Sequence, residues 1–552
     1  MLSSAHGRWT TILARGGRGS VENGGADRSS TGRRGPPPSI LGMDAQERTS
    51  VLIVGGGLVG LAMSAFLARL GVPALLVERR SGPSPHPRAR GVNPRTMELL
   101  RLLGIADRVR DAESARALAG NHGIVAVETL AGRRLGELAE PYFRGVRDPA
   151  GLSPESWCMV HQDELEPLLR DRAVELGAAH RFGTEYVGHT ETDGGVVATV
   201  RDTASGRTAA VAADRLVAAD GAGGGIRERL GIGTHGPGAL ARFVNIAFTA
   251  DLTGPLDGRR FIMCYTTGTG TRSALLPVNN TDRWMLHVLR DADDASLPGP
   301  DECAALVRAA AGVPDLPVRV DGVLPWVSAG RVADAFAAGR AFLVGDAAHV
   351  MPPSGAFGAN VGVQDAHALA WRLAAVARGD AGPALLDGYD AERRPAADHA
   401  MRQAVLRSRD RPRFVGGGDA PPPDPDLEPD ENVVFGPEPD GTPGRRAPHV
   451  VLPGGTSTIH RYGTRFVLGH GPAGDGWGRA AAAAAADAGI GVDAYGGDDA
   501  WCAAHGVARD GAVLVRPDGV VAWRAATGPD DPGALAGALR GALAAPVPGA
   551  AR

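Results

Sequence analysis

Lysine is absent from this chain of 552 residues, so all 58 of its basic side chains are arginine. Without lysine the chain can form no Schiff base with a carbonyl substrate or pyridoxal phosphate, and it cannot contain a Walker A loop. Cysteine is scarce as well: the four residues, Cys158, Cys264, Cys303 and Cys502, form no C-x-x-C pair. That spacing excludes a disulfide scaffold and a cysteine zinc site, and it is typical of a protein from the reducing cytoplasm.

Other absences narrow the function further. No window of about 18 apolar residues exists, so no membrane-spanning helix is predicted. The formal net charge is only −4, which does not suggest binding to nucleic acid or to an anionic membrane. The 15 histidines contain no H-E-x-x-H pattern, so no metal site is expected.

Composition and periodicity divide the chain into several units, as its length leads one to expect. Residues 1–48 lack the apolar residues needed to form a core and do not resemble a secretory signal, and Met43 is an alternative start. From residue 50 onward, short apolar runs alternate with helical patterns, which is typical of an α/β protein. The predicted units are a disordered segment (1–48), an α/β part (49–239), a mostly antiparallel sheet (240–330), a second α/β part (331–410), a linker (411–447) and a small α/β unit (448–552).

The first chemical motif is the sequence GGGLVG at residues 55–60, which follows the apolar run Val51–Val54 and opens a helical pattern. Its glycines let the backbone approach a pyrophosphate, and the helix N-terminus supplies unpaired N–H groups and partial positive charge. Glu78 ends the next predicted strand, 18 residues after Gly60, where an acid accepts a hydrogen bond from a ribose hydroxyl. The pattern predicts a dinucleotide site and suits both FAD and NAD.

Two further motifs favour a flavin. A strand at 216–219 ends in Asp220-Gly221, and another at 341–344 is followed by Gly345-Asp346 and a glycine-rich loop that leads into a long helix. An acid at a strand end can bind ribityl hydroxyls. The helix after the loop presents N–H groups where a flavin ring carries negative charge.

With these three motifs in order, the chain resembles the class A flavoprotein monooxygenases, the para-hydroxybenzoate hydroxylase-like group. It is most similar to the branch that hydroxylates aromatic polyketides in antibiotic biosynthesis. The resemblance covers residues 50–405, together with Gly444–Pro448 and Leu514–Gly519. It implies a Rossmann-type FAD-binding domain, an inserted antiparallel-sheet substrate domain and a C-terminal thioredoxin-like domain.

The resemblance also implies roles for individual residues. Pro353 and Asn360 are expected beside the flavin ring, whereas Gly224 and Ala356 depart from the family pattern, which usually has Ser and Gly there. The candidates for substrate contact are Arg242, Tyr265 and His287, although polar residues on a half-buried sheet are more often structural. The residues expected to bind FAD are Gly55, Gly57, Leu58, Val59, Gly60, Glu78, Arg79, Arg88, Gln162, Asp220, Asp346, Pro353, Gly358, Ala359 and Asn360.

The implied reaction needs no side-chain nucleophile. NAD(P)H reduces FAD, and it is expected to bind transiently because the sequence contains only one dinucleotide-binding motif. O2 then forms a flavin C4a-hydroperoxide, which hydroxylates a phenolic, polycyclic natural-product intermediate. Baeyer–Villiger oxidation or epoxidation by the same kind of enzyme, and a non-catalytic flavoprotein that binds an intermediate, remain alternatives. A flavin halogenase is excluded, because its lysine and its W-x-W-x-x-P stretch are missing. Substrate identity and the choice between NADH and NADPH stay open, and a homodimer is a further expectation.

The C-terminal unit is predicted to be redox-inert. Dithiol chemistry in a thioredoxin fold requires C-x-x-C, whereas residues 448–552 contain only Cys502. A structural or dimer-contact role follows.

Overall fold

The structure is a computed structural model that describes residues 47–84, 86–138, 151–268, 272–291, 293–294, 296–410, 424–528 and 532–544. Nearly all of the segment predicted to be disordered, including Met43, lies outside these residues, as do residues 411–423 of the predicted linker. Within the described part of that linker, residues 430–435 form helix α12 (Asp430–Phe435).

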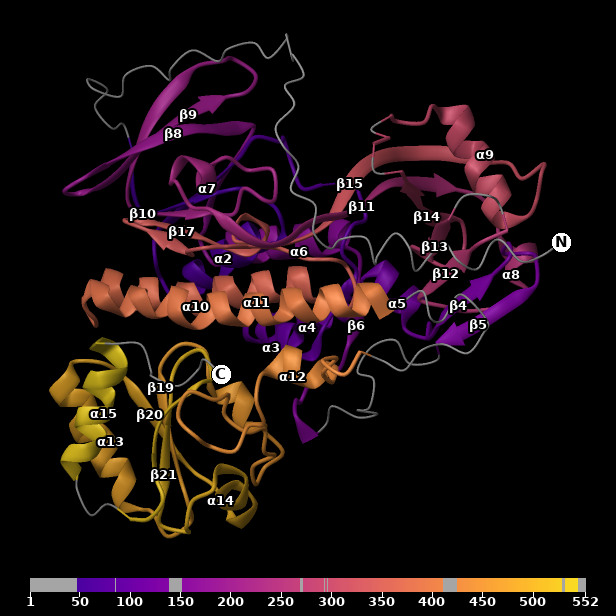
Figure 1. Ribbon diagram of the computed structural model, residues 1–552. Helices are drawn as coiled ribbons and strands as arrows, with labels where there is room; N and C mark the ends of the chain where they lie inside the picture. The colour runs from indigo at the N-terminus through magenta and orange to yellow at the C-terminus, as the bar shows by residue number, and fades with distance from the viewer. Residues whose placement is uncertain are drawn as a thin grey trace.

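The first sheet has a parallel core in the order β17-β10-β1-β2-β7. The last four residues of β1 are buried, as a strand covered on both faces requires. Helices α2 and α6 lie close to this sheet, and the long helices α10 and α11 run beneath it in the view of Figure 1. The strands are β1 (Glu47–Val54), β2 (Ala74–Glu78), β7 (Ala179–Phe182), β8 (Thr184–Thr192), β9 (Gly195–Asp202), β10 (Thr208–Ala218), β16 (Ala337–Ala338) and β17 (Ala341–Leu343); the helices are α2 (Leu58–Arg69), α6 (Gln162–Glu175), α7 (Ile226–Arg229), α10 (Phe357–Arg378) and α11 (Asp387–Asp410).

Smaller elements join the first sheet to the rest of the molecule. Helix α3 begins at Pro94 directly after Asn93, whose side chain accepts a hydrogen bond of 2.8 Å from the backbone N–H of Thr96. Asn93 therefore caps the helix and Pro94 occupies its first position, where a missing N–H costs nothing. These elements are β3 (Gly91–Val92), α3 (Pro94–Leu102), α4 (Ala106–Arg110), α5 (Glu113–Leu118) and β6 (Cys158–Met159).

The second sheet has the order β18-β15-β11-β14-β13-β12-β4-β5 and is antiparallel except for the pair β12 and β4. It extends beyond residues 240–330, since β4 and β5 come from residues 124–138. The short apolar run IVAV of β4 carries no alternation that would have assigned it to this sheet. The elements are β4 (Ile124–Val127), β5 (Arg134–Leu138), β11 (Thr234–Thr249), α8 (Thr253–Leu256), β12 (Met263–Thr266), β13 (Ser273–Pro277), β14 (Arg283–Arg290), α9 (Pro300–Ala311), β15 (Arg319–Ala333) and β18 (His349–Val350).

One face of the second sheet is covered by helix α9. Val244, Ile246 and Phe248 of β11 share a buried cluster with Cys303 and Val307 of that helix. Because side chains alternate along a strand, Phe243 and Asn245 must point to the opposite face. That alternation leaves one face of the sheet for a ligand.

The C-terminal unit has the topology of thioredoxin. Its sheet has the order β20-β19-β21-β22, in which β20 is parallel to β19 while β21 and β22 run antiparallel. The unit lies on the other side of α10 and α11 from the first sheet (Figure 1). Its elements are β19 (Phe466–His470), α13 (Gly476–Ala488), β20 (Val492–Gly496), α14 (Asp499–His505), β21 (Ala512–Val515), β22 (Val521–Ala525) and α15 (Pro532–Ala544). The predicted fold class is thus confirmed: a Rossmann-type domain, an inserted and mostly antiparallel sheet, and a C-terminal thioredoxin-like domain.

Cys502 lies on α14 and not in the loop between β19 and α13, where a thioredoxin fold carries its reactive cysteines. Its side chain is buried, and burial raises the pKa of the thiol. A thiol in such surroundings is a poor nucleophile.

Replacement of Cys502 with serine is therefore expected to leave hydroxylation unchanged. The substitution places a hydroxyl in a buried site, which should lower the free energy of unfolding by roughly 1 kcal/mol. Thermal melting and the rate of product formation measure the two effects. Loss of turnover in a variant that still binds FAD would show that the thiol takes part in the reaction.

Candidate flavin and substrate site

A cavity of about 1530 Å³ lies between the carboxyl ends of the first sheet and the open face of the second sheet. Ligands of open α/β sheets bind at this edge of the parallel strands. Of the residues predicted from sequence, those that line the cavity are Gly55, Gly57, Leu58, Val59, Glu78, Arg79, Arg88, Gln162, Asp220, Tyr265, His287, Asp346, Pro353, Gly358 and Ala359.

Three predicted residues, Gly60, Asn360 and Arg242, do not line this cavity. Gly60 is needed for close packing: a Cβ atom there would lie 1.9 Å from the carbonyl oxygen of Gly55. It lets helix α2 start directly against the glycine-rich turn. Gly55 itself has φ +113°, which side-chain-bearing residues rarely adopt.

Glu78 holds the glycine-rich turn against the second strand. Its carboxylate accepts hydrogen bonds from the backbone N–H of Gly56 at 2.7 Å and from the backbone N–H and Nε of Arg80 at 2.9 and 3.0 Å. Burial by itself would raise the pKa of Glu78, but the bonds from Arg80 and Gly56 lower it below its ordinary value. The carboxylate is thus ionised and retains lone pairs for a further donor from the cavity.

Asp220 lies over the glycines of the second motif. Its Oδ2 accepts a hydrogen bond of 3.1 Å from the backbone N–H of Ile226, and its Oδ1 is buried with no partner among the described residues. Burial raises the pKa of this carboxyl group. A Cβ atom at Gly224 would lie 2.1 Å from the carboxyl carbon, so the departure from the usual serine leaves space that Asp220 occupies.

Asp346 follows strand β17 and projects into the cavity, to which its side chain is exposed. Desolvation by the surrounding protein raises the pKa of its carboxyl group, and the charges of His349 and Arg88 partly oppose that shift. The loop is held from behind by Asp365, which contacts His349 Nε2 at 2.6 Å and accepts from Arg393 Nε at 2.8 Å.

The first turn of α10 faces the cavity through Gly358 and Ala359. The helix follows Ala356, whose φ of 54° lies in the left-handed region, which explains why a glycine is usual there. The Asn360 side chain is turned away: it donates to the carbonyl oxygen of Gly91 at 2.9 Å and accepts from the N–H of Asn93 at 3.0 Å. Asn360 therefore joins α10 to the start of α3.

The open face of the second sheet forms the other wall of the cavity. Tyr265, Ala274, His287 and Asn245 lie opposite one another on four adjacent strands and so make one polar row across the sheet. Arg242 is exposed and has the opposite parity to Phe243, so the structure does not bring it to this wall.

Beside the polar row lies an aromatic pair that sequence reasoning missed. Phe243 and Trp326 are stacked at 4.6 Å between ring centroids, with an interplanar angle of 12°. Trp326 Nε1 donates to Asn245 Oδ1 at 2.5 Å, and the ring of His287 meets Trp326 edge-on at 6.1 Å. The alternation of residues 243–248 could have predicted that Phe243 and Asn245 share one face of the sheet. It could not have predicted that Trp326, 83 residues further along the chain, lies opposite Phe243.

Comparisons with known proteins agree with this architecture. Residues 48–404 match the family described as FAD binding domain, and residues 440–546 match the family described as aromatic-ring hydroxylase, C-terminal. A putative polyketide hydroxylase of Streptomyces halstedii is 42% identical over 534 residues, which cover 87% of this chain and 94% of that protein. Tetracenomycin A2 monooxygenase-dioxygenase of Streptomyces glaucescens is 38% identical over 563 residues, covering 90% and 96%.

A solved structure is similar over most of its length. The ternary complex of aklavinone-11 hydroxylase with FAD and aklavinone has a TM-score of 0.80 and 36% identity, and the match covers 91% of this chain and 99% of that one. The chain therefore belongs to the FAD-dependent aromatic-ring hydroxylases. Within them it is a flavoprotein monooxygenase of the polyketide hydroxylase branch, as its motifs predicted, and FAD is its cofactor.

Neither of two other kinds of site is found in the part of the chain that the structure describes. None of its helices is long and apolar enough to cross a membrane. It also contains no group of three or more His, Cys, Asp or Glu side chains arranged to hold a metal ion.

Proposed function

We propose that this enzyme hydroxylates a flat, polycyclic phenolic intermediate of polyketide biosynthesis, with NAD(P)H and O2 as co-substrates. The observation that carries the proposal is a single cavity that joins the three cofactor motifs to an aromatic and polar wall on the second sheet. Two relatives with similar chains act, by their names, on tetracenomycin A2 and aklavinone.

The residues of the first sheet fit FAD. Carboxylates lie at or just beyond the carboxyl ends of three parallel strands of the sheet, β2, β10 and β17. The buried Oδ1 of Asp220 lacks a partner that a ligand hydroxyl or water would supply. The turn at Gly55–Gly60 and the N–H groups of α2 would bind the pyrophosphate, Glu78 the ribose, and Asp346 the ribityl chain. Bound there, FAD supplies the redox chemistry, namely reduction by NAD(P)H and activation of O2.

The first turn of α10 would lie against the flavin ring. Its backbone N–H groups lack partners within the helix, and the helix dipole places partial positive charge there. Pro353 and Ala359, which line the cavity before and within this turn, would then flank the ring. In this position the chain stabilises negative charge on the ring without a charged side chain.

The second sheet would bind the substrate. A planar ring system can stack against the Phe243–Trp326 pair, while oxygen substituents meet Tyr265, His287 and Asn245 in the polar row. Leu289 and Leu324 border the row and help to exclude water from the cavity. The wall therefore recognises the shape of a fused aromatic system and the position of its oxygens.

A substrate panel tests the function directly. Polycyclic phenols are expected to stimulate NAD(P)H oxidation and O2 consumption, and the product should gain one oxygen atom on an aromatic carbon. Monocyclic phenols should stimulate less, because they cover less of the Phe243–Trp326 surface. A protein that binds polycyclic phenols without oxidising NAD(P)H would be a non-catalytic flavoprotein; a lactone or an epoxide product would contradict hydroxylation.

Replacement of Pro353 with glycine is expected to raise the hydrogen peroxide released per NAD(P)H several-fold. The change removes a rigid apolar ring from the cavity wall and admits water where the reaction needs a dry site. Pro300→Gly, at the exposed start of α9, is the matched control and should leave coupling unchanged. Equal coupling in both variants would show that Pro353 does not lie beside the flavin.

Two further expectations belong to the same proposal. All four cysteines are free and buried, which favours the reducing cytoplasm as the location of the enzyme. A homodimer is the expected assembly, and light scattering of the purified protein would measure it.

A further inference from the structure

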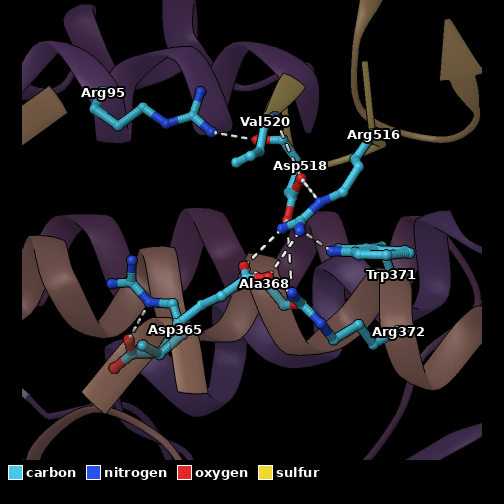
Figure 2. Close-up of polar contacts among 10 residues, drawn as sticks. Arg95, Asp365, Ala368, Trp371, Arg372, Arg516, Asp518 and Val520 are labelled. Atoms are coloured by element: carbon cyan, nitrogen blue, oxygen red, sulfur yellow. Dashed lines mark hydrogen bonds and ion pairs between the residues drawn. The ribbon is translucent and has the colours of Figure 1, made fainter. Parts of the chain in front are cut away.

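The turn between β21 and β22 leaves the C-terminal unit and inserts among helices of the flavin-binding part. We call residues 516–519 the RPDG turn, after their sequence. The backbone oxygen of Asp518 accepts from Arg95 Nη2 on α3 at 2.9 Å, and its Oδ2 accepts from Trp371 Nε1 on α10 at 2.9 Å. Arg516 donates twice to Glu392 on α11, at 2.7 Å each. Figure 2 shows Arg516 and Asp518 between Arg95 above and Trp371 and Arg372 below.

The contact is buried and its charges are paired. The side chains of Arg372, Arg516 and Asp518 are exposed by only 1%, 3% and 6%, and Arg372 Nη2 lies 2.7 Å from Glu392 Oε2. Burial alone would raise the pKa of Asp518, but the charge and hydrogen bonds of Arg516 lower it far below the ordinary range. Two guanidinium groups therefore face two ionised carboxylates inside the protein.

Such a cluster is a costly way to obtain stability. Removing two ion pairs from water carries a large desolvation penalty, and well-packed apolar residues in their place are often as stable or more so. Apolar packing is already present here, because Trp371 and Ala375 of α10 share a buried cluster with Phe466 and Leu468 of the C-terminal unit. What the charged cluster adds is geometric specificity. The paired bonds of Arg516 and the acceptors of Asp518 can all form in only one arrangement of α3, α10 and α11.

Other hydrogen bonds join the same helices to one another. The first turn of helix α10 lies at the cavity, and Trp371 lies further along the same helix. At a rise of 1.5 Å per residue, Asn360 and Trp371 are about 16 Å apart along the helix axis. At the cavity end, the Asn360 side chain bonds to Asn93, the cap of α3, and to Gly91 of β3. Helix α11 is tied to α10 through Arg393 and Asp365. The RPDG turn thus holds α10 and α11 at Trp371 and Glu392, away from the residues by which these two helices line the cavity. It holds α3 at Arg95, beside the Asn93 cap to which Asn360 is bonded.

We propose that the RPDG turn is a positioning element for the cofactor site. By holding α3, α10 and α11 together, it sets the place of the first turn of α10, so that the C-terminal unit supports FAD binding without touching FAD. Asp518 and Arg516 are the positioning residues. The proposal rests on the flavin position given above.

Two variants test the coupling in the full-length protein. Asp518→Ala removes the acceptor of Trp371 and a partner of Arg516, whereas Trp371→Phe removes only the donor on α10 and keeps an aromatic ring against Phe466. In the apoprotein, the amide hydrogens of residues 361–366, which close the first turns of α10, are expected to exchange about fivefold faster. The Kd for FAD, measured by flavin fluorescence, should rise about 5- to 10-fold, which corresponds to the net contribution of one ordinary hydrogen bond.

Asp499→Ala is the matched control. Asp499 pairs with Arg509 by two contacts of 2.5 and 2.6 Å on the exposed surface of the same unit, so the same loss of a carboxylate occurs away from the helices. It should change neither amide exchange nor the Kd. Wild-type exchange at 361–366 in both Asp518→Ala and Trp371→Phe, even with a lower melting temperature, would overturn the proposal. Faster exchange with an unchanged Kd would instead contradict the flavin position, so the two failures are distinguishable.

Discussion

Replacing Asp346 with alanine is expected to give a folded protein that has lost most of its FAD. Asp346 follows strand β17, and its side chain is exposed to the cavity rather than packed in the core. Its carboxylate would accept hydrogen bonds from the ribityl hydroxyls, and bonds to a charged group contribute roughly 1.5–3 kcal/mol. The Kd for FAD should therefore rise about 10- to 150-fold. Flavin absorbance per protein and titration of the apoprotein with FAD measure the effect.

The control for this variant is Asp334→Ala. Asp334 also carries a carboxylate near the end of a strand, but it is exposed on the surface, where it pairs with His235. Its removal should leave flavin content and melting temperature close to those of the wild type. Full flavin occupancy in Asp346→Ala would show that the third motif does not bind the cofactor where we place it.

Replacing Trp326 with alanine is expected to lower kcat/KM for a polycyclic substrate by roughly 30-fold while FAD stays bound. The variant removes the indole that stacks on Phe243, and with it the apolar and aromatic surface offered to the substrate, worth about 2 kcal/mol. Since none of the predicted FAD contacts involves Trp326, the flavin content should not fall. Steady-state kinetics with a polycyclic phenol provide the measurement.

Two further variants isolate the cause of that loss. Trp326→Phe keeps a stacking ring and removes only the bond to Asn245, so it should recover most of the activity. Trp523→Ala removes an equal side chain from the C-terminal unit, where it packs against Trp477, and should not alter KM. If Trp326→Ala kept a normal kcat/KM, the aromatic pair would not be part of the substrate wall.

The cofactor half of the cavity was open to prediction because its signals are local. The turn at residues 55–60 touches the strand before it and the helix after it, and Glu78 is fixed by the next strand. Glycines are required in such a turn because one backbone segment lies close to another. The spacing of the glycines in the sequence is therefore enough to predict the turn. Even so, the sequence did not show that the Asn360 side chain would turn away to join α10 to α3.

The substrate half was less accessible. Tyr265 and His287 were identified as candidates on the sheet, and they line the cavity, whereas Arg242 points away from it. Alternation shows that neighbours such as Arg242 and Phe243 lie on opposite faces, but it does not tell which face is covered. That depended on α9, a helix more than 50 residues further along the chain, which packs against Val244 and Ile246.

What the sequence by itself determined was the class of fold, the cofactor and the kind of reaction, because contiguous motifs of glycines, strand-end carboxylates and helix starts carry that information. Only the tertiary structure decided which side chains share a wall or a contact. Phe243 meets Trp326 through strand pairing, and Asp518 meets Arg95 and Trp371 through docking of one unit on another. Such contacts join residues 83 to 423 positions apart. They arise from packing of whole faces, and no local pattern specifies the partner.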